Sequence, residues 1–345
     1  MSLTASGTIK YSEIIAEFGT PNSGGLGEFR LSENVGTLTN LPLDTGVPQT
    51  GQIKFSDFYS KRLNQVVDLY STSVNNTSRQ NAKDRWNNGN VHIVGSSKTG
   101  KTQPPDTVED RVIINVNATI SSVKGTQTHC ALRPGNWDTN TTLEIEIGTS
   151  GKLYGSGGDG GTGGNANETA GTNGGTGSSA LGIQYPCTVN NLGVIQSGYG
   201  GGGGGGGNTR TTGGGKKSGA VTNGSSGGGG GGGAGSPAGA AGGVQTPLAV
   251  GGGTAGSAGA AGSLSNLVSG AGTGGAGGTE AGNGGNASAV NNSATKADNG
   301  TSPSGAAAEG TGGNNGYAII TNQGSAPSVT GNSATGRIIT STNPT

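Results

Sequence analysis

The strongest catalytic motif in this sequence of 345 residues is the segment 95–102, GSSKTGKT, which matches the phosphate-binding P-loop pattern. In such a loop the backbone N–H groups surround phosphates, the lysine reaches the terminal phosphate, and the last hydroxyl holds Mg²⁺. That geometry requires a helix that begins directly after the loop. Here Pro104 and Pro105 follow, and Pro104 bars Gln103 from helical angles. We therefore predict a hairpin loop rich in Gly and Lys, with nucleotide binding as the alternative.

Other catalytic constellations are weaker still. His92 and His129 are the only histidines, and His129 would point away from Cys130 if both lie on one strand. Glu144 and Glu146 share one strand face, as paired glycosidase carboxylates could, but alternating charges on a strand usually face water. We expect no catalytic residue, no cofactor and no enzyme activity.

Metal binding is not expected either. The segment 155–167, GSGGDGGTGGNAN, is similar to calcium-binding nonapeptide repeats but supplies a single Asp. Cys130 and Cys187 form no CxxC pair, so they predict no metal site. Buried free thiols are the favoured interpretation of the two cysteines, with one disulfide as the alternative.

The chemistry that the sequence does favour is recognition by polar loops. Residues 208–223, NTRTTGGGKKSGAVTN, lie between the two longest glycine runs, 200–207 and 227–233. Hydroxyl, amide and guanidinium groups held on a rigid scaffold suit sugars or polar protein loops. The predicted receptor-binding residues are Tyr199, Asn208, Thr209, Arg210, Thr211, Lys216 and Lys217, with Tyr199 as a stacking face. A solvated loop without a ligand is the alternative.

Glycine is the residue that must position these loops. Of the 77 glycines, 63 lie after residue 150, which leaves too little side chain for an ordinary core. Such a tail is either disordered or built from close-packed backbone. Only eleven charged residues occur there, apolar pairs recur along it, and the strict Gly period of collagen is absent. We therefore expect polyproline II helices that pack directly and exchange N–H to C=O hydrogen bonds.

The rest of the chain divides into three predicted segments. Residues 1–63 form a compact module, with helical spacing around Ile14 and Phe18 and a helix stop at Gly19. The stretch 51–59 also contains several aromatic residues, and Ser56 within it is expected to be the N-cap of a second helix. Residues 64–90 are predicted to be a polar spacer with a short helix at 80–86. Residues 91–150 form a small β-domain with strands at 91–94, 112–123 and 142–147.

A loose internal repeat links this domain to the tail. The segments 142–158, 180–198 and 317–341 each run strand, polar turn, Gly and apolar pair. We interpret them as apolar layers that bracket or cross the glycine sheets. The predicted fold is thus multidomain, mainly β and irregular: a small N-terminal α/β module (1–63), the spacer (64–90), the β-domain (91–150) and a polyglycine II helix sandwich (151–345).

Composition excludes several partners. The formal charge is zero and no long basic cluster exists, so nucleic acid and anionic membrane are poor partners. No apolar run is long enough to cross a membrane, and the first residues lack the apolar core of a signal peptide. The sequence therefore predicts a soluble protein without membrane insertion or a cleaved signal.

Two parts of the chain resemble proteins of tailed bacteriophages. The runs GYGGGGGGGGNTRTTGGG and GSSGGGGGGGAGSPAGAAGG look like those of glycine-rich adhesins at the ends of tail fibres. The opening, ASGTIKYSEIIAEFG followed by GVPQTGQIKFSDFYSKR, resembles a short N-terminal module of phage virion proteins, especially those of cyanobacterial phages. The middle of the chain is not covered by either resemblance.

The resemblance implies a virion protein, assembled in the host cytoplasm, that attaches to tail or baseplate proteins through residues 1–63. Phe18, Phe55, Phe58 and Tyr59 are the candidate attachment residues, although core packing is the favoured role of these aromatics. The resemblance further implies recognition of a host surface glycan or outer-membrane protein by loops at 165–172, 208–223, 244–250 and 288–301. Phage fibres are often trimeric, so the resemblance also implies a homotrimer.

We therefore expect a non-enzymatic tail fibre or distal adhesin. The first alternative is a connector or decoration protein of tail, neck or capsid that never touches the host. An ice-binding or matrix protein and a P-loop nucleotide binder are the remaining alternatives.

Overall fold

The protein is represented by a computed structural model. It describes residues 3–20, 24–69, 80–99, 111–165, 169–212, 221–243, 257, 260–261, 307–322, 324, 326–335, 337–340 and 344.

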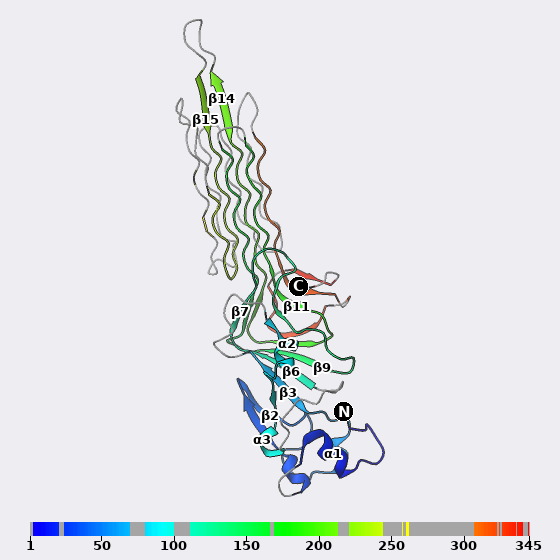
Figure 1. Ribbon diagram of the computed structural model, residues 1–345. Helices are drawn as coiled ribbons and strands as arrows, with labels where there is room; N and C mark the ends of the chain where they lie inside the picture. Colours follow the sequence, from blue (N-terminus) through cyan, green and yellow to red (C-terminus); the bar gives the residue numbers. More distant parts are fainter. Residues whose placement is uncertain are drawn as a thin grey trace.

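Most regular structure in the described residues is β, and most strands run parallel. The chain forms three sheets and adds one strand to each of them in turn. It then returns to the first sheet, where its next strand pairs beside the previous one. This arrangement is a parallel β-helix. Figure 1 shows it in the middle of an elongated molecule, with the N-terminal module at one end and long extended segments at the other.

The first sheet has six strands. Its spatial order is β17 (Ser328–Gly331), β12 (Thr188–Asn191), β9 (Thr142–Ile147), β6 (Arg111–Val116), β3 (Asn64–Asp68) and β5 (His92–Ile93). Only β5 pairs antiparallel, at the edge beside β3.

The second and third sheets complete each coil. The second contains β13 (Val194–Gln196), β10 (Lys152–Tyr154) and β7 (Thr119–Ser121). The third contains β18 (Arg337–Ile339), β16 (Tyr317–Thr321), β11 (Ser179–Ile183), β8 (Cys130–Arg133) and β4 (Gln80–Asn81).

Alternating apolar residues explain how the coils stack. In β9 the predicted TLEIEI alternation is present, and Ile145 and Ile147 point into the core while Glu144 and Glu146 are half-buried on the outer face. Ile145 pairs with Ile114 of β6 and Val189 of β12. Because the register is shared, equivalent apolar side chains form continuous ladders through the β-helix, and burying them stabilises it by roughly 1.5–3 kcal/mol per large side chain.

The internal repeat is explained by these coils. Each of its three segments contains a strand of the first sheet, and 180–198 and 317–341 begin with strands of the third. The apolar pairs do form layers, but they belong to one β-helix and do not cross glycine sheets.

Two predicted boundaries therefore differ from the structure. Asn64–Asp68 were assigned to a polar spacer, yet they form β3, the first coil of the β-helix. The boundary at 150 also fails, since β9 pairs with β12 and β8 with β11 across it. The helix predicted at 80–86 is present as α2 (Ala82–Asn87), and its N-cap is Asn81, whose side chain accepts hydrogen bonds from the Lys83 and Asp84 amides.

The N-terminal module contains α1 (Tyr11–Phe18), the short 3₁₀ helices η1 (Leu26–Phe29) and η2 (Phe55–Phe58), and a hairpin of β1 (Ser32–Val35) and β2 (Leu38–Pro42). The helix ends at Gly19, which has φ 92°, as the sequence predicted. Residue Ser56 is not the cap of the second helix, because η2 begins one residue earlier and Lys54 occupies that position.

This module is joined firmly to the β-helix. Arg111 donates three hydrogen bonds to the Glu144 carboxylate, from Nη2 at 2.8 and 2.9 Å and from Nε at 3.1 Å, and its Nη1 lies 3.7 Å from Asp44 of the module. Arg62 donates to the Asn140 carbonyl (2.8 Å) and to the Thr142 hydroxyl (2.9 Å). The module thus caps the first coil of the β-helix.

Candidate functional site: the glycine rods and their far end

Extended glycine-rich segments leave the β-helix between its second and third sheets. One excursion, 155–178, connects β10 to β11; the other, 197–316, connects β13 to β16. We call their described extended parts the glycine rods: 155–165, 169–178, 198–207, 227–234, 237–243 and 307–316. They run side by side away from the β-helix (Figure 1).

Small hydroxyl side chains form the base of the rods. The hydroxyls of Ser122 and Ser156 are each hydrogen-bonded to the Ser178 hydroxyl, and all three residues are fully buried. The Ser156 amide donates to Ser122 Oγ (2.9 Å) and Ser178 Oγ (3.0 Å). Serine is small enough to admit the backbone of neighbouring segments while it satisfies buried polar groups.

The rods are held together by backbone hydrogen bonds that repeat every three residues. Amides of Gly158, Gly161 and Gly164 donate to carbonyls of residues 199, 202 and 205, each at 2.8 Å. The same period links 198–207 to 169–178 and 307–316 to 198–207. A chain with roughly three residues per turn presents its amides in this way.

The uninterrupted glycine run 200–207 belongs to a central rod. A Cβ at Gly204 would stand 1.9 Å from the Thr162 carbonyl oxygen, and one at Gly203 would stand 2.1 Å from the Gly310 oxygen. Amides of Gly202 and Gly205 donate to carbonyls of a further neighbour, the rod 227–234. Because backbone surrounds this rod, side chains have no room on any of its sides.

The rod 155–165 carries a side chain at every third position. Along 155–165 these are Ser156, Asp159, Thr162 and Asn165. The Thr162 and Thr172 hydroxyls lie 3.0 Å apart, and the Asn165 amide donates to Thr169 Oγ1 at 2.6 Å. The outer surface of the rods therefore consists of short, mostly uncharged polar groups.

Asp159 is one of two charged residues in the rods, and the other is Glu309. The Asp159 carboxylate accepts hydrogen bonds from Lys124 Nζ (2.5 Å) and from the Ala240 amide (2.6 Å). Partial burial raises the pKa of Asp159, but these two hydrogen bonds and the Lys124 charge outweigh it and lower the pKa below its ordinary value. The ionised carboxylate thus joins the β-helix to two rods.

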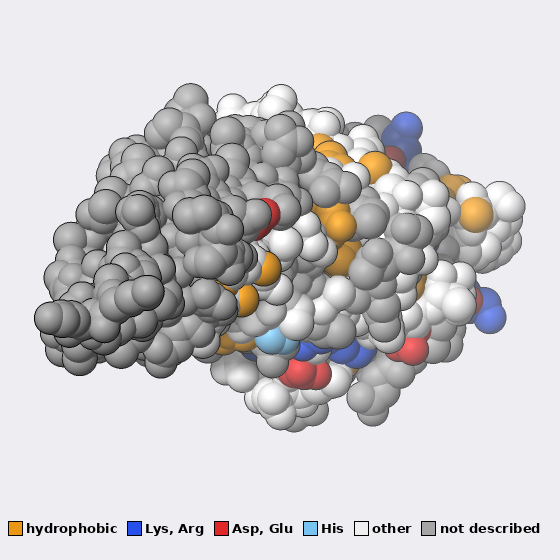
Figure 2. Space-filling view, turned by 90° about the horizontal axis from the view of Figure 1, so that it is seen from above, with side chains coloured by type: hydrophobic (Ala, Val, Ile, Leu, Met, Phe, Trp, Pro, Cys, Tyr) orange, Lys and Arg blue, Asp and Glu red, His pale blue; other side chains and the backbone are white. Residues whose placement is uncertain are grey.

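A β-hairpin lies at the far end of the central rods. It consists of β14 (Asn208–Thr212) and β15 (Val221–Ser225), paired antiparallel with Asn208 opposite Ser225 and Thr212 opposite Val221. Figure 1 shows it beyond the rods, at the end of the molecule opposite the N-terminal module. Viewed from this end, white backbone and uncharged polar atoms predominate on the described surface, interrupted by hydrophobic patches and scattered charged side chains (Figure 2).

The predicted recognition residues divide into three groups. Asn208, Thr209, Arg210 and Thr211 are all in β14, so the structure brings them together on the hairpin. Lys216 and Lys217 lie outside the described residues, as do the predicted loops 244–250 and 288–301 and part of 165–172.

The prediction that Tyr199 is an accessible recognition residue is wrong. Its side chain is fully buried at the base of the rods, and its hydroxyl receives a hydrogen bond from Gln196 Nε2 at 3.2 Å. It therefore fills the space beneath the central rod and cannot serve as an accessible stacking face. The signal that could have shown this is its position directly between a strand and the glycine run.

The aromatic attachment candidates mostly form a core. Rings of Phe18, Phe29 and Phe58 pack at centroid distances of 5.5–6.1 Å, and Phe18 and Phe58 are fully buried. Tyr59 packs partly buried against the same cluster. Phe55 alone is available for attachment, with 43% of its surface exposed.

The catalytic motifs are only partly within the described residues. Ser96–Thr99 form a short helix, α3, whereas the remaining P-loop positions, Gly100, Lys101 and Thr102, lie outside. Glu144 is paired with Arg111, and Glu146 accepts a hydrogen bond from Asn190 Nδ2 at 2.8 Å. Cys130 and Cys187 are both free thiols, as predicted, but only Cys130 is fully buried and Cys187 is partly buried.

Among the described residues, no cluster of three or more His, Cys, Asp or Glu side chains could hold a metal. Within the same part of the chain, no helix is long and apolar enough to span a membrane.

The fold and site together define a class: a parallel β-helix that bears a bundle of glycine rods with a terminal hairpin. No family model and no curated protein matches this sequence. Among solved structures, the chain is similar to the crystal structure of the gp37-gp38 adhesin tip complex of the bacteriophage S16 long tail fiber. The identity is 18% and the TM-score 0.31, over 98% of this chain and 99% of that one. A TM-score at this level does not establish a common fold.

Proposed function

We propose that this protein is a non-enzymatic phage tail-fibre adhesin whose glycine rods form a polyglycine II sandwich and display receptor-binding loops. The observation that carries the proposal is the terminal hairpin β14–β15, held at the far end of rods that exchange backbone hydrogen bonds at a three-residue period. Glycine at the buried positions lets the rods pack without side chains, so the bundle is stiff although it has almost no apolar core.

The N-terminal module has the complementary role in this proposal. It lies at the end of the molecule opposite the hairpin (Figure 1). Its sequence resemblance to virion modules supports attachment to another tail or baseplate protein, with the exposed Phe55 ring as the contact. The receptor would then be a host surface glycan or an outer-membrane protein at the opposite end.

A loop exchange tests the receptor role. Replacement of residues 213–220, GGGKKSGA, by a Gly-Ser linker of equal length removes Lys216 and Lys217 and leaves the sequences of the rods, β14 and β15 unchanged. We expect phage particles that assemble normally and adsorb to host cells at least about tenfold less, as for removal of one binding hot spot worth more than about 1.4 kcal/mol. Equal adsorption of the exchanged and parental particles would favour a connector or decoration role instead.

A control separates receptor loss from failed assembly. A Gly-Ser replacement of residues 21–23, which lie between α1 and η1 in the sequence, is a comparable kind of edit that does not touch the hairpin. Particles with this control should adsorb as the parent does, and immunodetection of the protein on purified particles should give equal amounts for all three.

A further inference from the structure

An asparagine followed by glycine is open to attack by the glycine amide, because glycine has no Cβ to obstruct the approach. The glycine nitrogen bonds to the asparagine Cγ, and the side-chain nitrogen leaves as ammonia. Water then opens the resulting succinimide to aspartate or isoaspartate. The sequence contains such pairs at 88–89, 173–174, 223–224, 283–284, 299–300 and 315–316. Each pair is therefore a candidate site of spontaneous deamidation, although 283–284 and 299–300 lie outside the described residues.

The pair 173–174 is held by a neighbouring rod on both of its reacting groups. The Gly174 amide donates to the Thr311 carbonyl at 2.8 Å. The Thr311 amide in turn donates to Asn173 Oδ1, also at 2.8 Å. Ring closure needs the glycine amide to lose its proton and its nitrogen to reach the asparagine Cγ. Both steps require these two bonds between rods to break.

The pair 315–316 is held in a similar way by the central rod. The Gly316 amide donates to the Gly198 carbonyl at 2.9 Å, and Asn315 Oδ1 accepts from the Gly200 amide at 2.8 Å. Asn315 is also buried, with 2% of its surface exposed. Neither group of this pair is released unless two rods separate.

The pair 88–89 is in a different environment. Asn88 is the C-cap of α2, and it and both of its neighbours in the chain are exposed. The Gly89 amide donates to the Trp86 carbonyl at 3.0 Å, at the end of a helix of only 6 residues. A Cβ on Gly89 would meet nothing within 4 Å. Because helix ends open at low cost, this amide is released far more often than an amide inside the rods.

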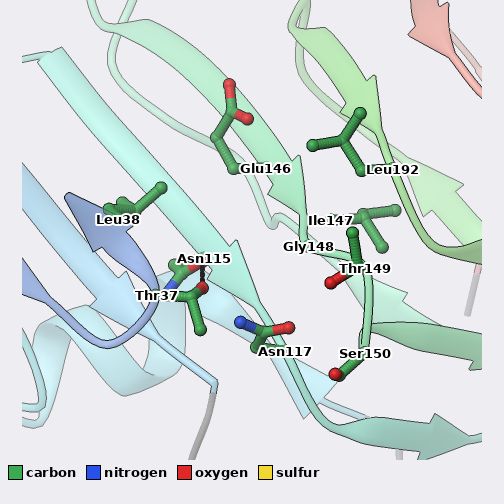
Figure 3. A pocket seen from close by; sticks show the side chains of 10 residues that line it. All are labelled: Thr37, Leu38, Asn115, Asn117, Glu146, Ile147, Gly148, Thr149, Ser150 and Leu192. Carbon is green, nitrogen blue, oxygen red and sulfur yellow. Dashed lines mark hydrogen bonds between the residues drawn. The ribbon is translucent and has the colours of Figure 1, made fainter.

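Asparagines on the side of the β-helix show the opposite case. Asn115 and Asn117 line a pocket of about 340 Å³ between the turn of the β1–β2 hairpin and the ends of β6 and β9 (Figure 3). Both are buried, and the residues that follow them, Val116 and Ala118, carry a Cβ. The Asn115 side chain is also fixed, since its Nδ2 donates to Asp68 Oδ1 at 3.0 Å. These positions lack both the exposed side chain and the following glycine.

We propose that Asn88 is a site of spontaneous deamidation, and that the packing of the glycine rods protects Asn173 and Asn315 from the same reaction. Reaction at Asn88 requires only fraying of one helix end, whereas reaction in the rods requires their separation. The product adds a carboxylate beside the last carbonyls of α2, where negative charge is unfavourable. Ageing of the protein thus alters α2 and spares the rods.

Peptide mapping by mass spectrometry tests the proposal on the full chain after incubation at mildly basic pH. We expect deamidation at Asn88 to be at least about tenfold faster than at Asn173 and Asn315. In denaturant, where the hydrogen bonds of all three pairs are lost, the three rates should become similar. Asn88→Gln should abolish deamidation in its peptide, and Asn87→Gln is the matched control that should leave it unchanged.

Gly204→Ala supplies an independent test of the protection. The Gly204 amide donates to the carbonyl of Thr172, the residue before Asn173, at 2.9 Å. Opening of the rods there should accelerate deamidation at Asn173 by about tenfold or more and leave the rate at Asn88 unchanged.

The outcomes are distinct. Equal rates at Asn88 and Asn173 in the folded protein, or no deamidation at Asn88, would overturn the proposal. Rates at Asn173 and Asn315 that denaturant does not raise would overturn it as well, because the protection would then not come from the fold. None of these measurements involves adsorption to host cells, so failure here is distinguishable from failure of the receptor proposal.

Discussion

The packing of the central rod yields a sharp prediction for Gly204→Ala. The added Cβ would stand 1.9 Å from the Thr162 carbonyl oxygen, whereas real contacts of this kind are not shorter than 3.0 Å. The two rods must therefore separate by at least 1.1 Å, the difference of these two distances. Rotation does not relieve the contact, because the Gly204 amide is bonded to the Thr172 carbonyl (2.9 Å) and the Gly204 carbonyl to the Gly310 amide (2.8 Å).

The expected cost follows from the hydrogen bonds that this separation stretches. Two or three bonds at about 1 kcal/mol each, together with overpacking, give about 2–4 kcal/mol for local opening of the rods. Hydrogen exchange measured by mass spectrometry should then accelerate by about 30-fold to 1,000-fold over 155–165 and 198–207. Exchange over the β-helix strands should change little.

Gly243→Ala is the matched control, because its Cβ would meet only Thr162 Cγ2, at 3.9 Å. We expect it to be neutral or to stabilise the rods by up to about 1 kcal/mol, since Ala restricts the unfolded chain. Equal protection in the parent and in Gly204→Ala, or equal loss in both variants, would refute the close-packed-backbone reasoning.

Three further predictions concern the ends of the molecule and its thiol. Phe58→Ala should destabilise the N-terminal module by about 3–5 kcal/mol in denaturant unfolding, against under about 1 kcal/mol for the half-exposed Phe55→Ala, and similar losses for both would contradict the assigned core. The stabilisation from ionised Asp159 is fully present above the ordinary Asp pKa of 3.8 and should be lost as the pH falls through the lowered pKa of the folded state. Hydrogen exchange of the rods should therefore show an acid-dependent increase in the parent that is absent in Asp159→Asn. An equal increase in this variant would assign the pH dependence to another group. Burial raises the pKa of the Cys187 thiol to about 12, so iodoacetamide at neutral to mildly basic pH should label it about a thousandfold more slowly than in unfolded protein, and rapid native labelling would place the thiol at the surface.

The sequence predicted local elements better than their long-range pairing. The strand 142–147 and the stop of α1 at Gly19 followed from alternation and from glycine's tolerance of positive φ. The β-helix was missed because its successive coils are interrupted by the excursions 155–178 and 197–316, which separate paired strands such as β11 and β16 by more residues than local patterns can connect. Asn64–Asp68 look polar in isolation, yet Asn64 and Gln65 are fully buried by neighbours that only the fold provides.

Dependence on contacts between distant segments also limited the prediction of the site. Composition identified residues 208–211 as belonging together, but Tyr199 was misplaced because burial at the base depends on Gln196 and on rods from distant segments. The pocket beside Asn117 was not predicted at all. Its lining comes from the N-terminal hairpin and from several coils, and no short motif spans them.

The three-residue period of the rods restricts how genes for such proteins can change. Inserting or deleting one codon within 198–207 would rotate every following glycine by about a third of a turn, toward neighbours bonded in a different phase. A change of about three codons restores the phase, provided that the adjacent rods tolerate the altered length. Codon-by-codon length variation is therefore expected to be rare within the rods, which change only in whole turns.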